Sequence, residues 1–125
     1  MSEPAMRLVC VVDDDDDVRN SLRALLESSG FAVETFSSAA QFLESASGSR
    51  AACLLLDLQM PVMSGLELLE LLRARAIWTP AIFLTANGFK LERRIANTQA
   101  LAVLRKPVDD EELLRWLEKA SADRA

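Results

Sequence analysis

The chain contains a run of five aspartates, residues 13–17, directly behind the apolar stretch LVCVV, residues 8–12. Carboxylates held about 4 Å apart repel one another by roughly 4 kcal/mol per pair at an effective dielectric constant of about 20. The run is therefore a solvated surface, a helix start or a cation site. We expect Asp13 and Asp14, at the end of the apolar stretch, to serve a cation site, and residues 15–17 to be exposed to solvent.

A calcium loop is the first alternative for this run, because Asp13, Asp15 and Asp17 alternate along it. Such a loop requires glycine at its sixth position and glutamate at its twelfth. The chain has Val18 and Ala24 at these two places. We therefore exclude a calcium loop.

Three further apolar stretches also end in a polar side chain. In a parallel sheet the carboxyl ends of the strands lie at one edge, where ligands bind, so we expect these side chains to meet the aspartates there. They are Asp57 in ACLLLD (residues 52–57), Thr85 in AIFLT (residues 81–85) and Lys106 in AVLRKP (residues 102–107).

Three carboxylates, a hydroxyl and an ammonium group at one edge suit a magnesium ion that holds a phosphoryl group. Mg²⁺ prefers oxygen ligands and needs only one or two carboxylates when substrate oxygens complete its shell. A carboxylate can then attack phosphorus and form an aspartyl phosphate. The lysine and the metal would neutralise charge on the transferred group. Asp57 could merely cap the turn that follows it, but a carboxylate ending a buried strand is costly without such a role.

The segments between the apolar stretches show helical spacing of their apolar residues. Five strands that alternate with helices predict a doubly wound α/β fold, a parallel sheet covered by helices on both faces. We expect one domain over residues 1–125, with its core at about residues 6–120. Beside the stretches above, the predicted elements are a helix from Val18 to Gly30 capped by Asp16 or Asp17, a strand over residues 32–36, a helix in SSAAQFLESA capped by Ser37 or Ser38, a helix opened by Ser64 and Gly65, and an acid-led helix over residues 109–120.

Composition narrows the functional classes. Nineteen acidic against fourteen basic residues give a net charge of -5, the wrong sign for binding nucleic acid or an anionic membrane. The chain has no histidine, which excludes a Ser-His-Asp nucleophile and a histidine phosphoacceptor of its own. Cys10 and Cys53 lie in apolar runs without CxxC spacing, so we expect buried reduced thiols. No apolar stretch reaches 18 residues and no signal peptide is visible, which favours the cytoplasm.

The segments VVDDDDDVR, LLLDLQMPVMSG, FLTAN and RKP together resemble, in order and spacing, the signatures of response-regulator receiver domains of two-component systems. The stretch from VVDDDDDVRNSL to FAVETFSSAAQFL is most similar to receivers of the FixJ type. The resemblance spans nearly the whole chain and implies a flavodoxin-like, CheY-like fold with strand order 2-1-3-4-5. It implies no output domain within these residues.

The resemblance also implies a role for each matched residue. Asp57 corresponds to the phosphoacceptor, Asp14 to a direct Mg²⁺ ligand, and Asp13 to an acid that holds the ion through water. The backbone carbonyl of Gln59 corresponds to a further metal ligand. Thr85 corresponds to the switch hydroxyl, and Lys106 corresponds to the lysine that pairs with the aspartate or its phosphate. The bond between Lys106 and Pro107 corresponds to one that is commonly cis in the family. Asn87 and Gln59 correspond to positions that tune the phosphoryl lifetime.

A domain of this family takes its phosphoryl group from a sensor histidine kinase or a phosphotransfer protein, and it catalyses only its own phosphorylation and dephosphorylation. It then changes the surface of its fourth helix, fifth strand and fifth helix, which contacts an output domain or partner protein and can form a phosphorylation-dependent dimer. One departure concerns this surface. Val103 stands where many receivers carry a switching tyrosine or phenylalanine, within NGFKLERRIANTQALAVL, residues 87–104.

Two other functions therefore stay open. The first is a receiver-fold binding module that acts without phosphorylation, which the departure around Val103 leaves possible. The second is an aspartate-nucleophile phosphatase. Such enzymes favour a second aspartate two residues after the nucleophile, where this chain has Gln59.

Overall fold

The computed structural model describes residues 7–45, 50–86 and 92–123 of the chain. Within these residues strands and helices alternate from one end to the other, as the sequence predicts. The elements are β1 (Leu8–Val12), α1 (Asp16–Ser28), β2 (Ala32–Phe36), α2 (Ala39–Leu43), β3 (Cys53–Asp57), α3 (Gly65–Ala74), β4 (Ala81–Thr85), α4 (Glu92–Asn97), β5 (Ala102–Arg105) and α5 (Asp110–Asp123).

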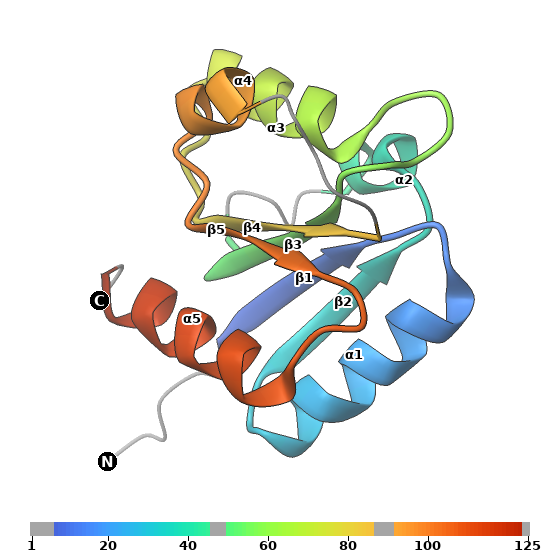
Figure 1. Cartoon of the computed structure of the whole chain (residues 1–125), viewed down its shortest axis with the longest axis vertical. Helices are drawn as coiled ribbons and strands as arrows, with labels where there is room; N and C mark the ends of the chain where they lie inside the picture. The colour runs from blue at the N-terminus through green and yellow to red at the C-terminus, as the bar shows by residue number, and fades with distance from the viewer. Residues whose placement is uncertain (1–6, 46–49, 87–91, 124–125) are drawn as a thin grey trace.

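The strands form one parallel sheet in the order β2-β1-β3-β4-β5. Helices α1 and α5 cover one face of this sheet, and α2, α3 and α4 cover the other (Figure 1). The predicted doubly wound sheet and its strand order are confirmed. None of the helices in the described part of the chain is both long enough and apolar enough to span a membrane.

The core consists of two apolar layers, one on each side of the sheet. Successive residues of a strand point to opposite faces, so a strand buried on both sides is apolar throughout. In β3, Leu54 and Leu56 pack toward α2 and α3, whereas Cys53 and Leu55 pack toward α1 and α5. Burying one leucine side chain stabilises the fold by about 2 kcal/mol. The central strands β1, β3 and β4 therefore hold the sheet in place.

The two cysteines are buried free thiols, as predicted. Cys10 belongs to the layer beneath α2 and α3, and Cys53 belongs to the layer beneath α1 and α5. Burial raises the pKa of each thiol to about 12. Both are therefore protonated and unreactive at neutral pH.

Helix α1 begins earlier than the apolar pattern predicts, and the predicted cap at Asp16 or Asp17 is wrong. The cap is Asp15, whose backbone is extended and whose side chain accepts hydrogen bonds from the N–H groups of Asp17 (2.8 Å) and Val18 (3.2 Å). Asp16 and Asp17 instead occupy the first turn, where the helix dipole favours acidic side chains. Residues 15–17 are exposed, as predicted.

One of the two serines predicted to cap α2 does so, and the predicted start of α3 at Ser64 and Gly65 is confirmed. Ser38 accepts a hydrogen bond from the N–H of Gln41 and caps α2. Ser64 caps α3 through a capping box, in which Glu67 accepts the N–H of Ser64 and Ser64 accepts the N–H of Glu67. This box fixes where α3 begins, directly beside the carboxyl end of β3.

Helix α4 comes from the segment that the sequence pattern left without a prediction. Two cationic side chains tie its region to α3. Arg94 of α4 pairs with Glu70 of α3, with 2.6 Å between Nη2 and Oε1. Arg73 of α3 donates a hydrogen bond of 2.7 Å from Nε to the carbonyl of Thr98, just beyond α4. These polar contacts act together with the packing of Ile95 against the core to hold α4 in place.

Candidate functional site

The polar residues at the strand ends lie at one edge of the sheet. Asp13 and Asp14 follow β1, and Asp57 ends β3. Thr85 ends β4, where it is buried and pairs with Arg105 of β5. Its carbonyl accepts a 2.8 Å hydrogen bond from the N–H of Lys106, so the strand ends are held in register.

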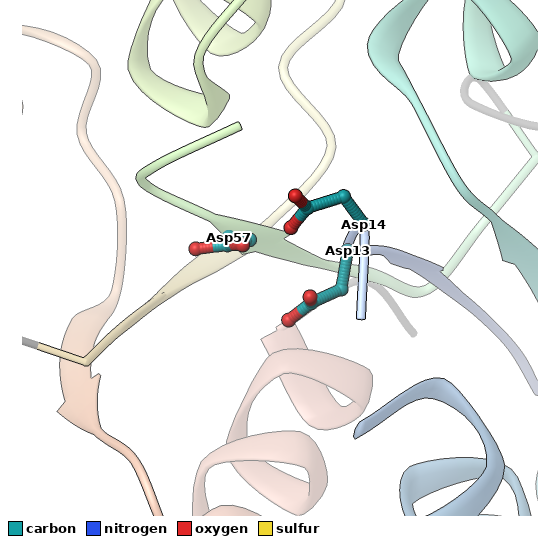
Figure 2. A group of neighbouring side chains, drawn as sticks. All are labelled: Asp13, Asp14 and Asp57. Atoms are coloured by element: carbon teal, nitrogen blue, oxygen red, sulfur yellow. The ribbon is translucent and has the colours of Figure 1, made fainter. Parts of the chain in front are cut away.

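Three carboxylates form a compact cluster at this edge. Oxygen atoms of Asp13, Asp14 and Asp57 all lie within 4.8 Å of one another. Asp13 is 0% exposed and Asp57 is 3% exposed, whereas Asp14 is exposed to solvent. Figure 2 shows the carboxylate of Asp14 pointing toward Asp57, and that of Asp13 on the other side of the end of β1. The cluster therefore has a buried floor and one side that solvent reaches.

Lys106 supplies a positive charge to this cluster. Its Nζ lies 2.8 Å from Oδ2 of Asp13 and 3.4 Å from Oδ2 of Asp57, and its side chain is 17% exposed. Burial by itself would lower the pKa of Lys106, but the hydrogen bond and charge of Asp13, followed by those of Asp57, raise it. The ammonium group is therefore charged at neutral pH and leaves the three carboxylates only partly neutralised.

The environment of Asp57 disfavours its ionised form. Burial is the largest cause and, together with the charge of Asp13, raises the pKa of Asp57 to about 6. The backbone N–H of Gln59, which donates a 3.0 Å hydrogen bond to Oδ1, and the charge of Lys106 act in the opposite direction. A carboxylate with this excess of negative charge around it is suited to binding a cation.

The backbone around Asp13 is held from several sides. Its N–H donates to the carbonyl of Phe36 at 3.1 Å, and its Oδ1 accepts the N–H of Asp15 at 2.9 Å. Arg19 of α1 donates from Nη1 to the carbonyl of Asp13 at 2.6 Å. Hydrogen bonds therefore help to fix the turn from β1 into α1.

Gly65 allows α3 to start against the backbone of Asp57. A Cβ atom at position 65 would lie 2.1 Å from the carbonyl oxygen of Asp57, well inside van der Waals contact. Because the obstacle is backbone, it cannot turn aside as a flexible side chain would. Any larger residue at this position must move either the start of α3 or the end of β3.

We expect Gly65→Ala to destabilise the fold by about 1 to 3 kcal/mol, the usual cost of overpacking, and to weaken binding of a phosphoryl mimic at Asp57. Gly30→Ala is a matched control. Its φ of 94° makes a side chain strained, but nothing lies within 4 Å of the added Cβ. Urea unfolding should therefore show a loss in both variants, whereas a titration with beryllofluoride and Mg²⁺ should show weaker binding only in Gly65→Ala. Equal binding by both variants would contradict this account of Gly65.

Two other residues named from the sequence, Gln59 and Val103, lie in the described part of the chain. Gln59 is exposed, and its N–H contacts Asp57. Asn87 lies outside the described residues. Val103 lies on the edge strand β5 and is 40% exposed. The bond between Lys106 and Pro107 is cis, as the resemblance implies.

Sequence reasoning missed two residues that support the site. Gly65 was named only as part of a helix start, although glycine in a first helical turn is a poor helix former and so signals a close approach. Arg19 carried a weaker signal, an isolated basic residue three positions after an acidic one, which is the spacing of neighbours on a helix.

Comparison with known proteins places this geometry in a family. The protein-family model that describes the response regulator receiver domain matches residues 9–118 of the chain. The chain belongs to the response regulator receiver domain family. This receiver domain is 45% identical over 103 residues to the transcriptional regulatory protein FixJ of Azorhizobium caulinodans. The matched residues make up 82% of the chain and 49% of that protein. It is 36% identical over 108 residues to the response regulator protein TodT of Pseudomonas putida, covering 86% of the chain and 48% of TodT.

Solved structures agree with this assignment. The response regulator StyR matches the receiver domain with a TM-score of 0.85 and 42% identity, covering 96% of this chain and 63% of that one. The chemotaxis protein CheY4 of Vibrio cholerae matches with a TM-score of 0.83 and 29% identity, covering 93% and 99% of the two chains. The receiver domain spans about half the length of the curated relatives named above. Phosphorylation-dependent signalling is the standard function of its family.

Proposed function

We propose that this receiver domain accepts a phosphoryl group on Asp57 and transmits the change to its surface. The observation that carries the proposal is a buried carboxylate with its pKa raised to about 6, set beside two further aspartates and 3.4 Å from Lys106. In the transfer, Oδ of Asp57 attacks phosphorus and a P–O bond forms. The P–N bond of the donor's phosphohistidine breaks, and its electron pair stays on the imidazole nitrogen. These residues contain no histidine, so the phosphohistidine lies outside them, and the proposed donor is a sensor histidine kinase or a phosphotransfer protein.

The carboxylate cluster supports Mg²⁺ as the cofactor. Its donors are all oxygens, their spacing within 4.8 Å allows one ion to be shared, and one side of the cluster is open for waters and phosphoryl oxygens. We assign Asp14 and Asp57 as direct ligands, Asp13 as a ligand through water, and the carbonyl of Gln59 as a further ligand. When bound, Mg²⁺ would offset negative charge on the transferring phosphoryl group.

Lys106 and Thr85 complete the assignment. The ammonium group of Lys106 already pairs with Asp13 and Asp57, so it is placed to pair with a phosphoryl group on Asp57. Thr85 ends the neighbouring strand, where the backbone of Leu84 pairs with that of Asp57. The hydroxyl of Thr85 is therefore assigned as the group that reorients toward the phosphoryl oxygens. Asn87 and Gln59 are assigned to tuning the phosphoryl lifetime.

The output surface is assigned to α4, β5 and α5. Val103 offers exposed apolar surface on β5, and α4 is held by polar contacts that a shift of the β4 end could rearrange. An output domain, a partner protein or a second receiver is the proposed contact. The receiver is proposed as one domain within residues 1–125, acting in the cytoplasm and turning over no substrate besides its own phosphoryl group.

Amide NMR with beryllofluoride and Mg²⁺ tests this proposal. We expect shifts at Asp57 and Thr85 that require Mg²⁺ and extend along β5 to Val103. The variant Asp57→Asn should show none of them. Shifts confined to the cluster would favour the phosphorylation-independent binding module, and an unchanged spectrum in the presence of Mg²⁺ would contradict phosphoryl acceptance.

A further inference from the structure

Arg19 is a cation on α1 that turns toward the acidic cluster rather than toward solvent. Its side chain is only 16% exposed, whereas Asp17 and Asn20 beside it on α1 are exposed. Nη1 donates a 2.6 Å hydrogen bond to the backbone carbonyl of Asp13, and Nη2 pairs with the carboxylate of Asp16. The guanidinium group therefore bridges the first turn of α1 and the end of β1.

The carbonyl that Arg19 holds belongs to the peptide unit that joins Asp13 to Asp14. A peptide unit is planar, so anchoring its carbonyl restricts the positions of the two flanking Cα atoms, from which the side chains of Asp13 and Asp14 project. The amide of Asp13 is already anchored to Phe36, and its carboxylate is anchored to Asp15 and Lys106. Arg19 supplies the remaining backbone anchor, on the side that leads to the exposed Asp14.

We propose that Arg19 is a positioning residue for the metal site, acting through the peptide between Asp13 and Asp14 to hold these two carboxylates at the spacing that a divalent cation needs. This inference rests on the proposed function, because it concerns the same cation site. In this role Arg19 would contact neither the cation nor the phosphoryl group, because its guanidinium group is engaged by the carbonyl of Asp13 and the carboxylate of Asp16. Its effect passes through a backbone carbonyl, as the partners of metal ligands commonly act.

Charge and position predict opposite results when Arg19 is replaced. A positive charge near the site repels Mg²⁺. If Arg19 acts through its charge alone, Arg19→Met should therefore bind Mg²⁺ more tightly than the parent chain. A positioning role means that Arg19→Met binds Mg²⁺ more weakly. Arg19→Lys separates the two further, because lysine keeps the charge but lacks the planar group that bridges two acceptors.

Titration with MgCl₂, followed by the amide signals of Asp14 and Asp15, tests the proposal. We expect roughly tenfold weaker Mg²⁺ binding in both Arg19→Met and Arg19→Lys, the scale of changes behind a metal ligand. The same amides should already be shifted, and exchange faster with solvent, in the metal-free variants. Arg23→Met is the matched control, because Arg23 lies one turn further along α1 and contacts Thr35 rather than the cluster. It should bind Mg²⁺ within about twofold of the parent chain.

The outcomes separate this inference from the proposed function. Equal or tighter Mg²⁺ binding by Arg19→Met, with the parent chain binding normally, overturns the role of Arg19 and leaves the proposed function standing. A parent chain that binds no Mg²⁺ overturns both. Thermal unfolding of each variant shows which are folded. If Arg19→Met does not fold, Arg19→Lys decides, since normal Mg²⁺ affinity in that variant contradicts a positioning role.

Discussion

Replacing Lys106 with methionine is expected to destabilise the metal-free protein by about 3 kcal/mol at pH 7, the scale of breaking one partner out of a buried ion pair. The 2.8 Å contact with Asp13 is the main reason, because that carboxylate is fully buried and would lose its positive partner. The loss should shrink when the pH is lowered, as Asp57 becomes protonated. Urea unfolding of the parent chain and of Lys106→Met at several pH values measures this loss in the free energy of unfolding.

Two further measurements, the effect of Mg²⁺ on stability and the rate of phosphorylation, make this experiment specific to the site. Mg²⁺ should restore much of the lost stability, because a divalent cation replaces the missing charge. Phosphorylation by acetyl phosphate should nevertheless be at least about tenfold slower, because Lys106 no longer offsets charge on the transferred group. Lys119→Met is the control. Lys119 is exposed and lies over the ring of Trp116 at 5.3 Å, so its removal should cost less than about 1 kcal/mol. Equal losses in the two variants would contradict the role assigned to Lys106.

Replacing Asp57 with asparagine should have the opposite effect and stabilise the metal-free protein by roughly 3 kcal/mol at pH 7. The pKa of Asp57 is raised by about two units, and each unit corresponds to about 1.4 kcal/mol. Between about pH 4 and pH 6 the folded chain holds a proton on Asp57 that the unfolded chain has released. The stability of the parent chain therefore falls as the pH rises through this window. Asparagine cannot ionise and removes this loss.

Thermal or urea unfolding of Asp57→Asn across pH 4 to 7, without Mg²⁺, checks this prediction. The difference from the parent chain should grow with pH and level off above about pH 6, where Asp57 is ionised. Glu27→Gln is the control, since Glu27 is exposed near the end of α1 and should change stability by less than about 0.5 kcal/mol. A constant difference across the whole range would show that the raised pKa of Asp57 is wrong.

The sequence predicts the fold well where burial is two-sided. Runs such as LVCVV and CLLL have no polar position, and only a strand covered on both faces tolerates that. The edge strand β5 was predicted by the same reasoning, although only Leu104 within it is fully buried. The start of α1 was less predictable than the starts of α2 and α3, whose serine caps were among those predicted. Apolar spacing reports the buried face alone, so the exposed first turn of α1, with Asp16 and Asp17, left no signal.

The convergence of the candidate site follows from topology. Once the strands are parallel, their carboxyl ends share one edge, and the polar residue at each end is brought to it. Which contacts form there was not predictable from the residue types. The pairing of Lys106 with Asp13 at 2.8 Å rather than primarily with Asp57, and the guanidinium of Arg19 on a backbone carbonyl, depend on side-chain paths set by the packing of α1 and α5.

The central claim is that a phosphoryl group is accepted on Asp57 with the help of Mg²⁺. The most direct measurement is intact-mass spectrometry after incubation with acetyl phosphate, followed by peptide mapping. We predict one phosphoryl group, located on Asp57, which forms with Mg²⁺, does not form in excess EDTA and is absent from Asp57→Asn. A phosphoryl group that Asp57→Asn retains, or a parent chain that stays unmodified in the presence of Mg²⁺, would contradict the account.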